Sequence, residues 1–500
     1  MKHSRSLFFL CLIAVQLLIS LLSDVQCFAQ TMNMKTERFG SDPGWDGHNN
    51  RSQTPPAVQI TQDFGYSSES SHAAGSDGEI GGSITPAGEP AYYAKVIPVA
   101  TLDDTLTASG TLNFQQYAHV LLGFFNADTV NEWRTPNTVS LRLLGRNHSF
   151  FFAYNDYATR LWRAGGNALI QTGGGEYEFA SGPGNVHTWS LTYDPNGNDG
   201  GGSVTATIGG ETVVTHLEPG HKSDGATFNR FGFLNVMKSV DTPGLLWLDN
   251  LTINGITENF DTNPNWDGLN NQNTYVSTNK RPRFDFGFSP TNNAGGKNGG
   301  EMGGSIFRGD SRVRFNGDRM AYYGDELDET LTLDQPLAAS GKVSFHRGVS
   351  DSTTLIGFFH SSDSIRDSDS QASAIPENFV GATIEGPSSQ GFYLYPSYGV
   401  NQEGVRSGGG HGFPQPPSIY PNGESHDWSL AYDPGANNGS GQLTVTLDGQ
   451  TVSLPLGPGH RKIGAHFDRF GIITTQIDGN GQTVYFDDLT YTVGIVSGPQ

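Results

Sequence analysis

The 500-residue sequence contains only two cysteines, Cys11 and Cys27, and both lie near the amino terminus. If this segment is removed, the mature chain has no cysteine. That excludes disulfides, a thiol nucleophile and Cys-ligated zinc. Stability is then expected to come from the size of the hydrophobic core, which a domain of more than about 200 residues can supply.

The first 29 residues have the features of a signal peptide. Lys2 and Arg5 make a basic start, residues 7–22 form an apolar run, and Cys27-Phe28-Ala29 has small residues at the two positions that a signal peptidase reads. The run is shorter than the roughly 20 residues needed to span a bilayer. We therefore expect cleavage after Ala29 and secretion, to the extracellular space, the cell surface or the periplasm.

Charge and long apolar segments are also scarce. Only 16% of residues are charged and the net charge is −21, which argues against binding of nucleic acid. No second apolar run is long enough to cross a membrane, so no membrane insertion is expected after cleavage. The sequence also contains 66 glycines and 26 prolines, which exclude a mainly helical chain.

The rest of the chain is a duplication. Trp45-Asp46-Gly47 recurs as Trp266-Asp267-Gly268, and further blocks follow in the same order. The most similar blocks are His187 and Trp189-Ser190-Leu191 with His426 and Trp428-Ser429-Leu430, Pro219-Gly220-His221 with Pro458-Gly459-His460, and Arg230-Phe231-Gly232 with Arg469-Phe470-Gly471. These matches predict two homologous domains, at residues 30–256 and 257–500, each expected to fold by itself.

Each copy has the pattern of antiparallel strands. Residues 443–447 alternate apolar and polar, Asp448-Gly449 forms a two-residue turn, and residues 450–454 alternate back. Trp189, Leu191 and Tyr193 fall on one face of a preceding strand. Many short, half-buried strands predict an all-β protein of two tandem antiparallel β-sandwich domains.

These features resemble the concanavalin A-like lectin and glucanase superfamily in its laminin G-like jelly-roll form. The features are a strand bearing Trp189 or Trp428, an Arg-Phe-Gly strand, and a closing strand at residues 248–252 or 486–490. The resemblance implies a jelly roll with a concave sheet and a role in binding carbohydrate or protein. Fold alone does not settle function.

Motifs for catalysis are missing. The Glu-x-Asp-x-x-Glu strand of the glucanase members does not occur, and neither does a Gly-x-Ser-x-Gly elbow. No His-x-His or His-x-x-x-His spacing points to zinc. The histidines that match between the copies, at 187 and 426 and at 221 and 460, are expected to make structural hydrogen bonds, with a metal site or general base as the alternative.

Jelly rolls of this kind often hold a structural calcium ion near the first and last strands. The resemblance therefore implies Ca²⁺ as a cofactor and carboxylate ligands near these strands. The residues implied are Asp249, Asp261, Asp487 and Asp488.

Residues found in only one copy are candidates for ligand specificity. In the first copy these are tryptophans with neighbouring arginines, which can stack on a sugar face, with core packing as the alternative. In the second copy they are arginines, which can bind carboxylate or sulfate, with salt bridges inside the copy as the alternative. The ligand-binding candidates are Trp133, Arg134, Trp162, Arg163, Arg308, Arg312 and Arg314.

The sequence thus favours a secreted, non-catalytic protein that recognises a polysaccharide or glycoconjugate. Two alternatives stay open: a glycosidase or polysaccharide lyase on the same fold, and an adhesion or surface-assembly protein that binds another surface protein.

Overall fold

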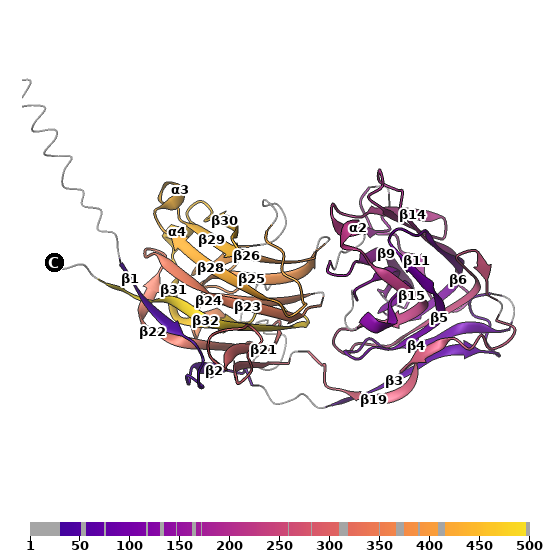
Figure 1. Cartoon of the computed structure of the whole chain (residues 1–500), viewed down its shortest axis with the longest axis horizontal. Helices are drawn as coiled ribbons and strands as arrows, with labels where there is room; N and C mark the ends of the chain where they lie inside the picture. The colour runs from indigo at the N-terminus through magenta and orange to yellow at the C-terminus, as the bar shows by residue number, and fades with distance from the viewer. Residues whose placement is uncertain are drawn as a thin grey trace, which may run out of the picture.

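The computed structural model describes residues 31–496 except 52–56, 75–76, 117–118, 131–134, 147, 163–166, 172, 259, 282, 310–318, 350, 367–374, 389–390 and 409–415. The predicted signal peptide, with Cys11 and Cys27, lies outside the described residues. Within them the protein is almost entirely antiparallel β-sheet, arranged as two sandwiches side by side (Figure 1). The all-β prediction is confirmed.

The first sandwich consists of a nine-stranded and an eight-stranded sheet. The nine-stranded sheet contains, in spatial order, β14 (Glu211–His216), β13 (Ser203–Ile208), β12 (Val186–Asp194), β6 (Leu106–Gln116), β16 (Gly244–Ile253), β4 (Glu79–Ile84), β3 (Val58–Ser67) and β19 (Gln272–Ser277), with β17 (Ile256–Thr257) also on β16. The eight-stranded sheet contains β10 (Asn167–Ala168), β9 (Phe150–Ala158), β8 (Thr138–Gly145), β7 (His119–Phe125), β15 (Thr227–Asn235), β5 (Tyr92–Thr101) and β18 (Asp267–Leu269), with β11 (Phe179–Ala180) also on β9.

The second sandwich repeats this plan with an eight-stranded and a seven-stranded sheet. The first of these contains β20 (Asp285–Ser289), β21 (Glu301–Phe307), β32 (Gly481–Val496), β23 (Leu337–Arg347), β28 (Ser425–Asp433), β29 (Gln442–Leu447) and β30 (Gln450–Pro455), with β1 (Thr31–Glu37) also on β32. The other contains β2 (Asp46–His48), β22 (Tyr322–Thr332), β31 (His466–Ile473), β24 (Ser352–Phe359), β25 (Phe379–Ser388), β26 (Gly391–Gly399) and β27 (Arg406–Gly408).

Helix is confined to single turns in the described residues. These are α2 (His221–Asp224), α3 (Ala436–Gly439), α4 (His460–Ile463) and the 3₁₀ turns η1 (Ala127–Thr129) and η2 (Asp363–Ile365). No helix in the described parts of the chain has the length and apolar character needed to cross a bilayer.

The predicted hairpin of the second copy is present. Leu447 pairs with Gln450, and Asp448 and Gly449 between them both have positive φ, as a type I′ turn requires. Trp189, Leu191 and Tyr193 alternate as buried residues along β12. Period-two burial therefore governs these strands as the sequence indicates.

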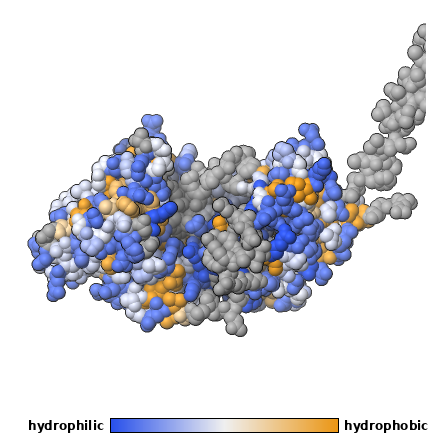
Figure 2. Space-filling model, turned by 180° about the vertical axis from the view of Figure 1, so that it is seen from behind, coloured by the Kyte–Doolittle hydropathy of each residue, from blue (hydrophilic) through white to orange (hydrophobic). Residues whose placement is uncertain are grey.

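Each sandwich has its own hydrophobic core between its two sheets. The surface is mostly hydrophilic, with separate hydrophobic patches on the face seen in Figure 2. The sandwiches also contact each other: Ser239 Oγ donates to Asn480 Oδ1 at 2.7 Å, and Val349 is buried with Met237 in a small cluster.

The sandwiches do not divide the strands at the domain boundary predicted between residues 256 and 257. The amino-terminal strands β1 and β2 pair with β32 and β22 of the second sandwich, and β18 and β19 pair with β5 and β3 of the first. In Figure 1 indigo β1 and β2 lie among the orange strands of the second sandwich, and pink β19 lies beside indigo β3. We call residues 31–51 and 256–277 the closing segments.

The same contacts hold both closing segments in place. Asn50 Nδ2 donates to the backbone oxygen of Phe286 at 2.7 Å, and Asn271 Nδ2 donates to that of Phe64 at 2.7 Å. The tryptophans of the two segments make equivalent ring contacts with tyrosines. In the second sandwich, Trp45 packs 5.7 Å from the ring of Tyr323.

Trp266 packs 5.6 Å from the ring of Tyr93. The repeated residues therefore make the same contacts in both sandwiches. In the first sandwich the closing segment contacts strands that precede it in the chain, and in the second it contacts strands that come much later. A core missing its closing segment is incomplete, because Phe39 and Trp45 belong to the core of the second sandwich and Phe260 to that of the first. This corrects the expectation that residues 257–500 form a self-contained unit.

Candidate functional site

The loops at one end of the first sandwich line an open cavity. Its walls come from the turn after β5, from η1, from the end of β9 and from α2. Lys222 fixes α2, because its Nζ donates to the backbone oxygens of Pro195 at 2.7 Å and Gly200 at 3.1 Å. The Asp224 carboxylate accepts from Leu161 N at 2.9 Å. The walls are thus held by hydrogen bonds.

The cavity has a volume of about 940 Å³. Ten of its fifteen lining residues have polar or charged side chains. The residues are Thr101, Leu102, Asp103, Asn126, Thr129, Asn137, Arg160, Gly200, Gly220, Lys222, Ser223, Asp224, Gly225, Ala226 and Thr227. Carboxylate, amide and guanidinium groups of this kind can donate to and accept from hydroxyl groups.

The second sandwich has a smaller cavity, about 320 Å³, at the corresponding place. It is lined by Asp334, Gly439, Ser440, Gly459, Arg461 and Lys462. By sequence repeat, Asp334 corresponds to Asp103 and Arg461 to Lys222. Arg461 reaches across to Asp334 at 3.2 Å, whereas Lys222 is 3.9 Å from Asp103, so the second cavity is crossed by a closer ion pair.

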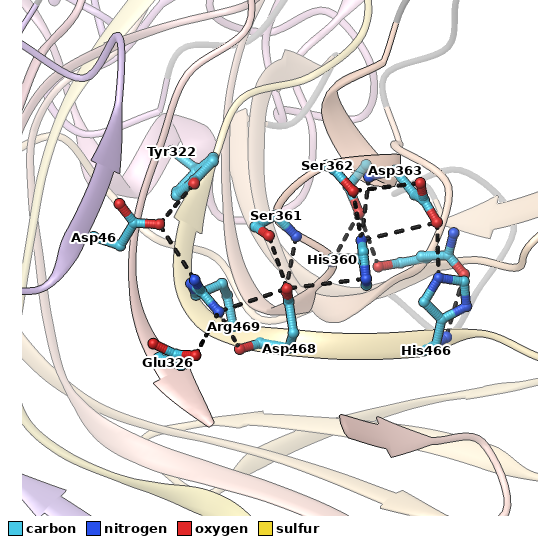
Figure 3. A network of polar contacts seen from close by, with 12 residues as sticks. Asp46, Tyr322, Glu326, His360, Ser361, Ser362, Asp363, His466, Asp468 and Arg469 are labelled. Atoms are coloured by element: carbon cyan, nitrogen blue, oxygen red, sulfur yellow. Dashed lines mark hydrogen bonds and ion pairs between the residues drawn. The ribbon is translucent and has the colours of Figure 1, made fainter. Parts of the chain in front are cut away.

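In the second sandwich, the positions that correspond to other lining residues of the first cavity hold a network of polar side chains (Figure 3). His360 follows β24, Asp363 begins η2, and His466 begins β31. Nε2 of His466 lies 2.8 Å from Oδ2 of Asp363, and Nδ1 of His360 lies 3.8 Å from the same oxygen. The hydrogen bond from His466 lowers the pKa of Asp363, and His360 adds to this effect. This carboxylate is therefore ionised at neutral pH.

Arg469 links this network to the closing segment. Its Nη2 is 3.4 Å from Oδ2 of Asp46, and its Nη1 is 3.5 Å from Oδ2 of Asp468. Tyr322 donates to the same Asp46 oxygen at 2.8 Å. The Arg-Phe-Gly motif therefore serves to anchor the closing segment, and Arg230 does the same with Asp267 at 2.9 Å in the first sandwich.

Two of the predicted ligand-binding residues lie in the described part of the chain. Trp162 stacks on His221 at 4.5 Å between ring centroids and meets Tyr420 of the second sandwich edge-on at 5.2 Å. Arg308 donates to Glu385 at 2.7 Å and to Thr353 at 2.9 Å. Both side chains are thus used for contacts within the protein. Trp133, Arg134, Arg163, Arg312 and Arg314 lie outside the described residues.

Buried carboxylates occupy equivalent places next to the closing strands. Asp249 and Asp487 are buried, and Oδ2 of each has no hydrogen-bond partner. Burial raises the pKa of Asp249, to which the charges of Glu79 and Asp261 add, and raises the pKa of Asp487 to about 7.

Neighbouring acids strengthen the effect in the second sandwich, because the charges of Asp488 and Glu301 also raise the pKa of Asp487. Oδ1 of Asp488 is itself buried without a hydrogen bond, although Nε of Arg38 lies 3.9 Å from it. Two neighbouring aspartates thus each have one buried oxygen without a hydrogen bond, and calcium takes oxygen ligands of this kind. If Ca²⁺ is bound, it adds positive charge next to these carboxylates.

The matched histidines make the hydrogen bonds expected of structural residues. His187 Nε2 is 2.8 Å from Ala180 O, and His221 and His460 each contact a tyrosine hydroxyl at 2.8 Å. Nδ1 of His426 lies 2.6 Å from Asp448.

The cluster of Figure 3 instead contains histidines that have no counterpart in the first copy. His360 stands where the first copy has Asn126, and His466 where it has Thr227. These two substitutions in otherwise matching blocks were the available sequence signal, and an analysis restricted to matched histidines misses it.

No protein-family model and no curated protein matches the chain. Solved structures that match it include the mouse laminin α1 chain, domains LG4-5, at 10% identity and a TM-score of 0.23, covering 85% of this chain and 90% of that one. An alginate lyase in complex with an alginate tetrasaccharide matches at 13% identity and a TM-score of 0.26, covering 40% and 82%.

The carbohydrate recognition domain of Emp47p matches at 10% identity and a TM-score of 0.24, covering 42% of this chain and 88% of that one. With identities and TM-scores this low, the function has to be argued from this chain's own residues.

Proposed function

We propose that the protein is secreted, binds a polysaccharide or glycoconjugate, and does so in the cavity of the first sandwich. The observation that carries the proposal is the lining of that cavity. Its volume, about 940 Å³, falls within the roughly 300–1,000 Å³ usual for small-ligand sites. It is wide enough for a few sugar rings.

The polar side chains at its rim suit sugar hydroxyls. The Asp103 side chain is 88% exposed and that of Arg160 is 69% exposed. A carboxylate and a guanidinium each offer two parallel hydrogen bonds, which matches a pair of neighbouring hydroxyl groups. Asn126 and Asn137 also line the cavity, and their amides are held in place by hydrogen bonds to Thr227.

We further propose that each sandwich holds a structural Ca²⁺, at Asp249 with Asp261 in the first and at Asp487 with Asp488 in the second. The unpartnered oxygens of Asp249 and Asp487 support this. Such an ion would tie the last strand of each sandwich to the loops beside it and would leave glycan binding to the cavity.

Binding should be tested with the mature protein on an array of neutral and acidic glycans, followed by titration of the best one. Asp103→Ala and Arg160→Ala are expected to weaken binding at least tenfold each, because each removes a bidentate contact. Both residues are exposed, so the melting temperature should not change.

Asp334→Ala, at the equivalent position of the second sandwich, is the matched control and should leave binding intact. Equal effects of the two aspartate substitutions would contradict the cavity assignment. Absence of binding to every glycan would contradict glycan recognition and favour a protein partner, and shortening of a bound polymer would favour an enzyme.

A further inference from the structure

The ligand atoms of His360, Asp363 and His466 all lie within 4.8 Å of one another. They come from three separate elements, the end of β24, η2 and the start of β31. Their side chains are 22%, 33% and 30% exposed, so an ion can reach them from solvent. In Figure 3 the two imidazoles and the carboxylate point toward one another.

We propose that His360, Asp363 and His466 bind a divalent transition metal ion, with Zn²⁺ as the representative case. Two imidazole nitrogens and one carboxylate oxygen are typical zinc ligands, whereas calcium takes oxygen ligands. Three protein ligands leave a fourth position for water or another small ligand. On binding, the hydrogen bond between His466 and Asp363 is replaced by two bonds to the metal of about 2.0–2.2 Å.

The surrounding residues support the site. Oδ2 of Asp468 lies 3.9 Å from Nε2 of His360. This carboxylate is fixed, because it accepts from the backbone N and the Oγ of Ser361, both at 2.7 Å. At 3.9 Å Asp468 acts on the His360 ring through its charge rather than through a hydrogen bond. Nδ1 of His360 accepts from Asp363 N at 3.2 Å, and a metal ion bound at this nitrogen would replace that hydrogen bond.

The first sandwich shows what the same backbone does without metal-binding side chains. Asn126 takes the place of His360, Thr227 that of His466 and Asn229 that of Asp468. Asn126 Nδ2 donates to Thr227 Oγ1 at 2.8 Å, and Asn229 Nδ2 donates to Asn126 Oδ1 at 3.1 Å. Hydrogen bonds alone close this position in the first copy, so the folded sandwich does not require a metal ion there.

The mature protein should be freed of metal with a chelator and titrated with Zn²⁺ by calorimetry, with excess Ca²⁺ present to occupy oxygen-ligand sites. We expect one equivalent to bind and to raise the melting temperature of the second sandwich. Co²⁺ at the same site should give a visible absorption spectrum of a nitrogen- and oxygen-ligated ion.

The variant His360→Asn with His466→Thr recreates the first copy's residues. It should lose Zn²⁺ binding by at least a hundredfold while its circular dichroism and its metal-free melting temperature stay unchanged. His426→Asn is the matched control and should bind Zn²⁺ as the parent does, because His426 pairs with Asp448 and belongs to no such cluster.

If the double variant fails to fold, Asp363→Asn provides the same test, since it preserves the shape of the side chain and removes the anionic ligand. A folded parent protein that binds neither Zn²⁺ nor Co²⁺ would overturn the proposal. Retention of the stoichiometric site in a folded variant, whether the double variant or Asp363→Asn, would also overturn it.

Discussion

The two sandwiches have the same strands and the same anchoring residues, but they are completed from different parts of the chain. The first is closed by residues 256–277, which directly follow its last long strand, β16. The second is closed by residues 31–51, which precede everything else in the structure. Similar sequence repeats therefore do not guarantee that a repeat and a folding unit coincide.

The strand ends explain how both arrangements produce one fold. In the first sandwich β16 turns back through Asn254 and Gly255 into β17. In the second, β32 runs on to Val496 and pairs there with Thr31. The first and last described strands thus pair where the first copy has a two-residue turn, so the second sandwich is a circular permutation of the first.

Deleting residues 31–51 should have the largest effect. The second sandwich would lose β1, β2, Phe39 and Trp45, so we expect it not to fold, while the first sandwich keeps a cooperative transition. Calorimetry combined with limited proteolysis would show this. Joining residues 285–496 through Asn-Gly to residues 31–51 should restore folding, whereas cooperative folding of residues 258–500 alone would contradict the closing role.

The tryptophans of the two closing segments provide the next test. Trp45→Ala should destabilise the second sandwich by about 3–5 kcal/mol, because a large buried side chain is lost. Trp266→Ala should destabilise the first by less, since Trp266 is only partly buried. Denaturant unfolding monitored for each sandwich separately measures both, and an unchanged second transition in the Trp45 variant would argue against its place in the core.

Calcium should stabilise both sandwiches through the same chemistry. An ion that binds only the folded state stabilises it by about 2.7 kcal/mol at a hundredfold excess over the dissociation constant. A chelator should therefore lower both melting temperatures. Asp249→Asn should remove the calcium dependence of the first sandwich and Asp487→Asn that of the second. Identical melting curves of the parent protein with and without chelator would contradict calcium binding.

Acid pH should produce the smallest difference in stability between the two sandwiches. Burial lowers the pKa of His221 to about 4, so the folded state binds this proton less readily than the unfolded state. Neutral His221 therefore contributes to the free energy of unfolding in full above pH 6.5. This contribution is lost as the pH falls toward 4, by roughly 2–3 kcal/mol. His221→Gln should flatten this dependence in the first sandwich, and His460→Gln serves as the control in pH-dependent unfolding.

The all-β class, the hairpins and the alternation of Trp189, Leu191 and Tyr193 were predictable because they depend on neighbours in the sequence. The pairing of β1 with β32 was not, because antiparallel pairing over 450 residues leaves no local pattern. Of the candidate site, the matched histidines behaved as expected. The cluster of His360 and His466 was missed because its members come from distant elements that only the folded sheet brings together.

The pairing of Thr31 with Val496 also has a consequence for the order of folding. During synthesis the first sandwich is complete as soon as residue 277 has emerged, but residues 31–51 must wait for more than 200 further residues before their partner strands exist. For that time residues 31–51, with Phe39 and Trp45, are unpaired and can pair with the second sandwich of another molecule. Slow synthesis or high concentration should then yield interlinked chains, in which each molecule completes its neighbour.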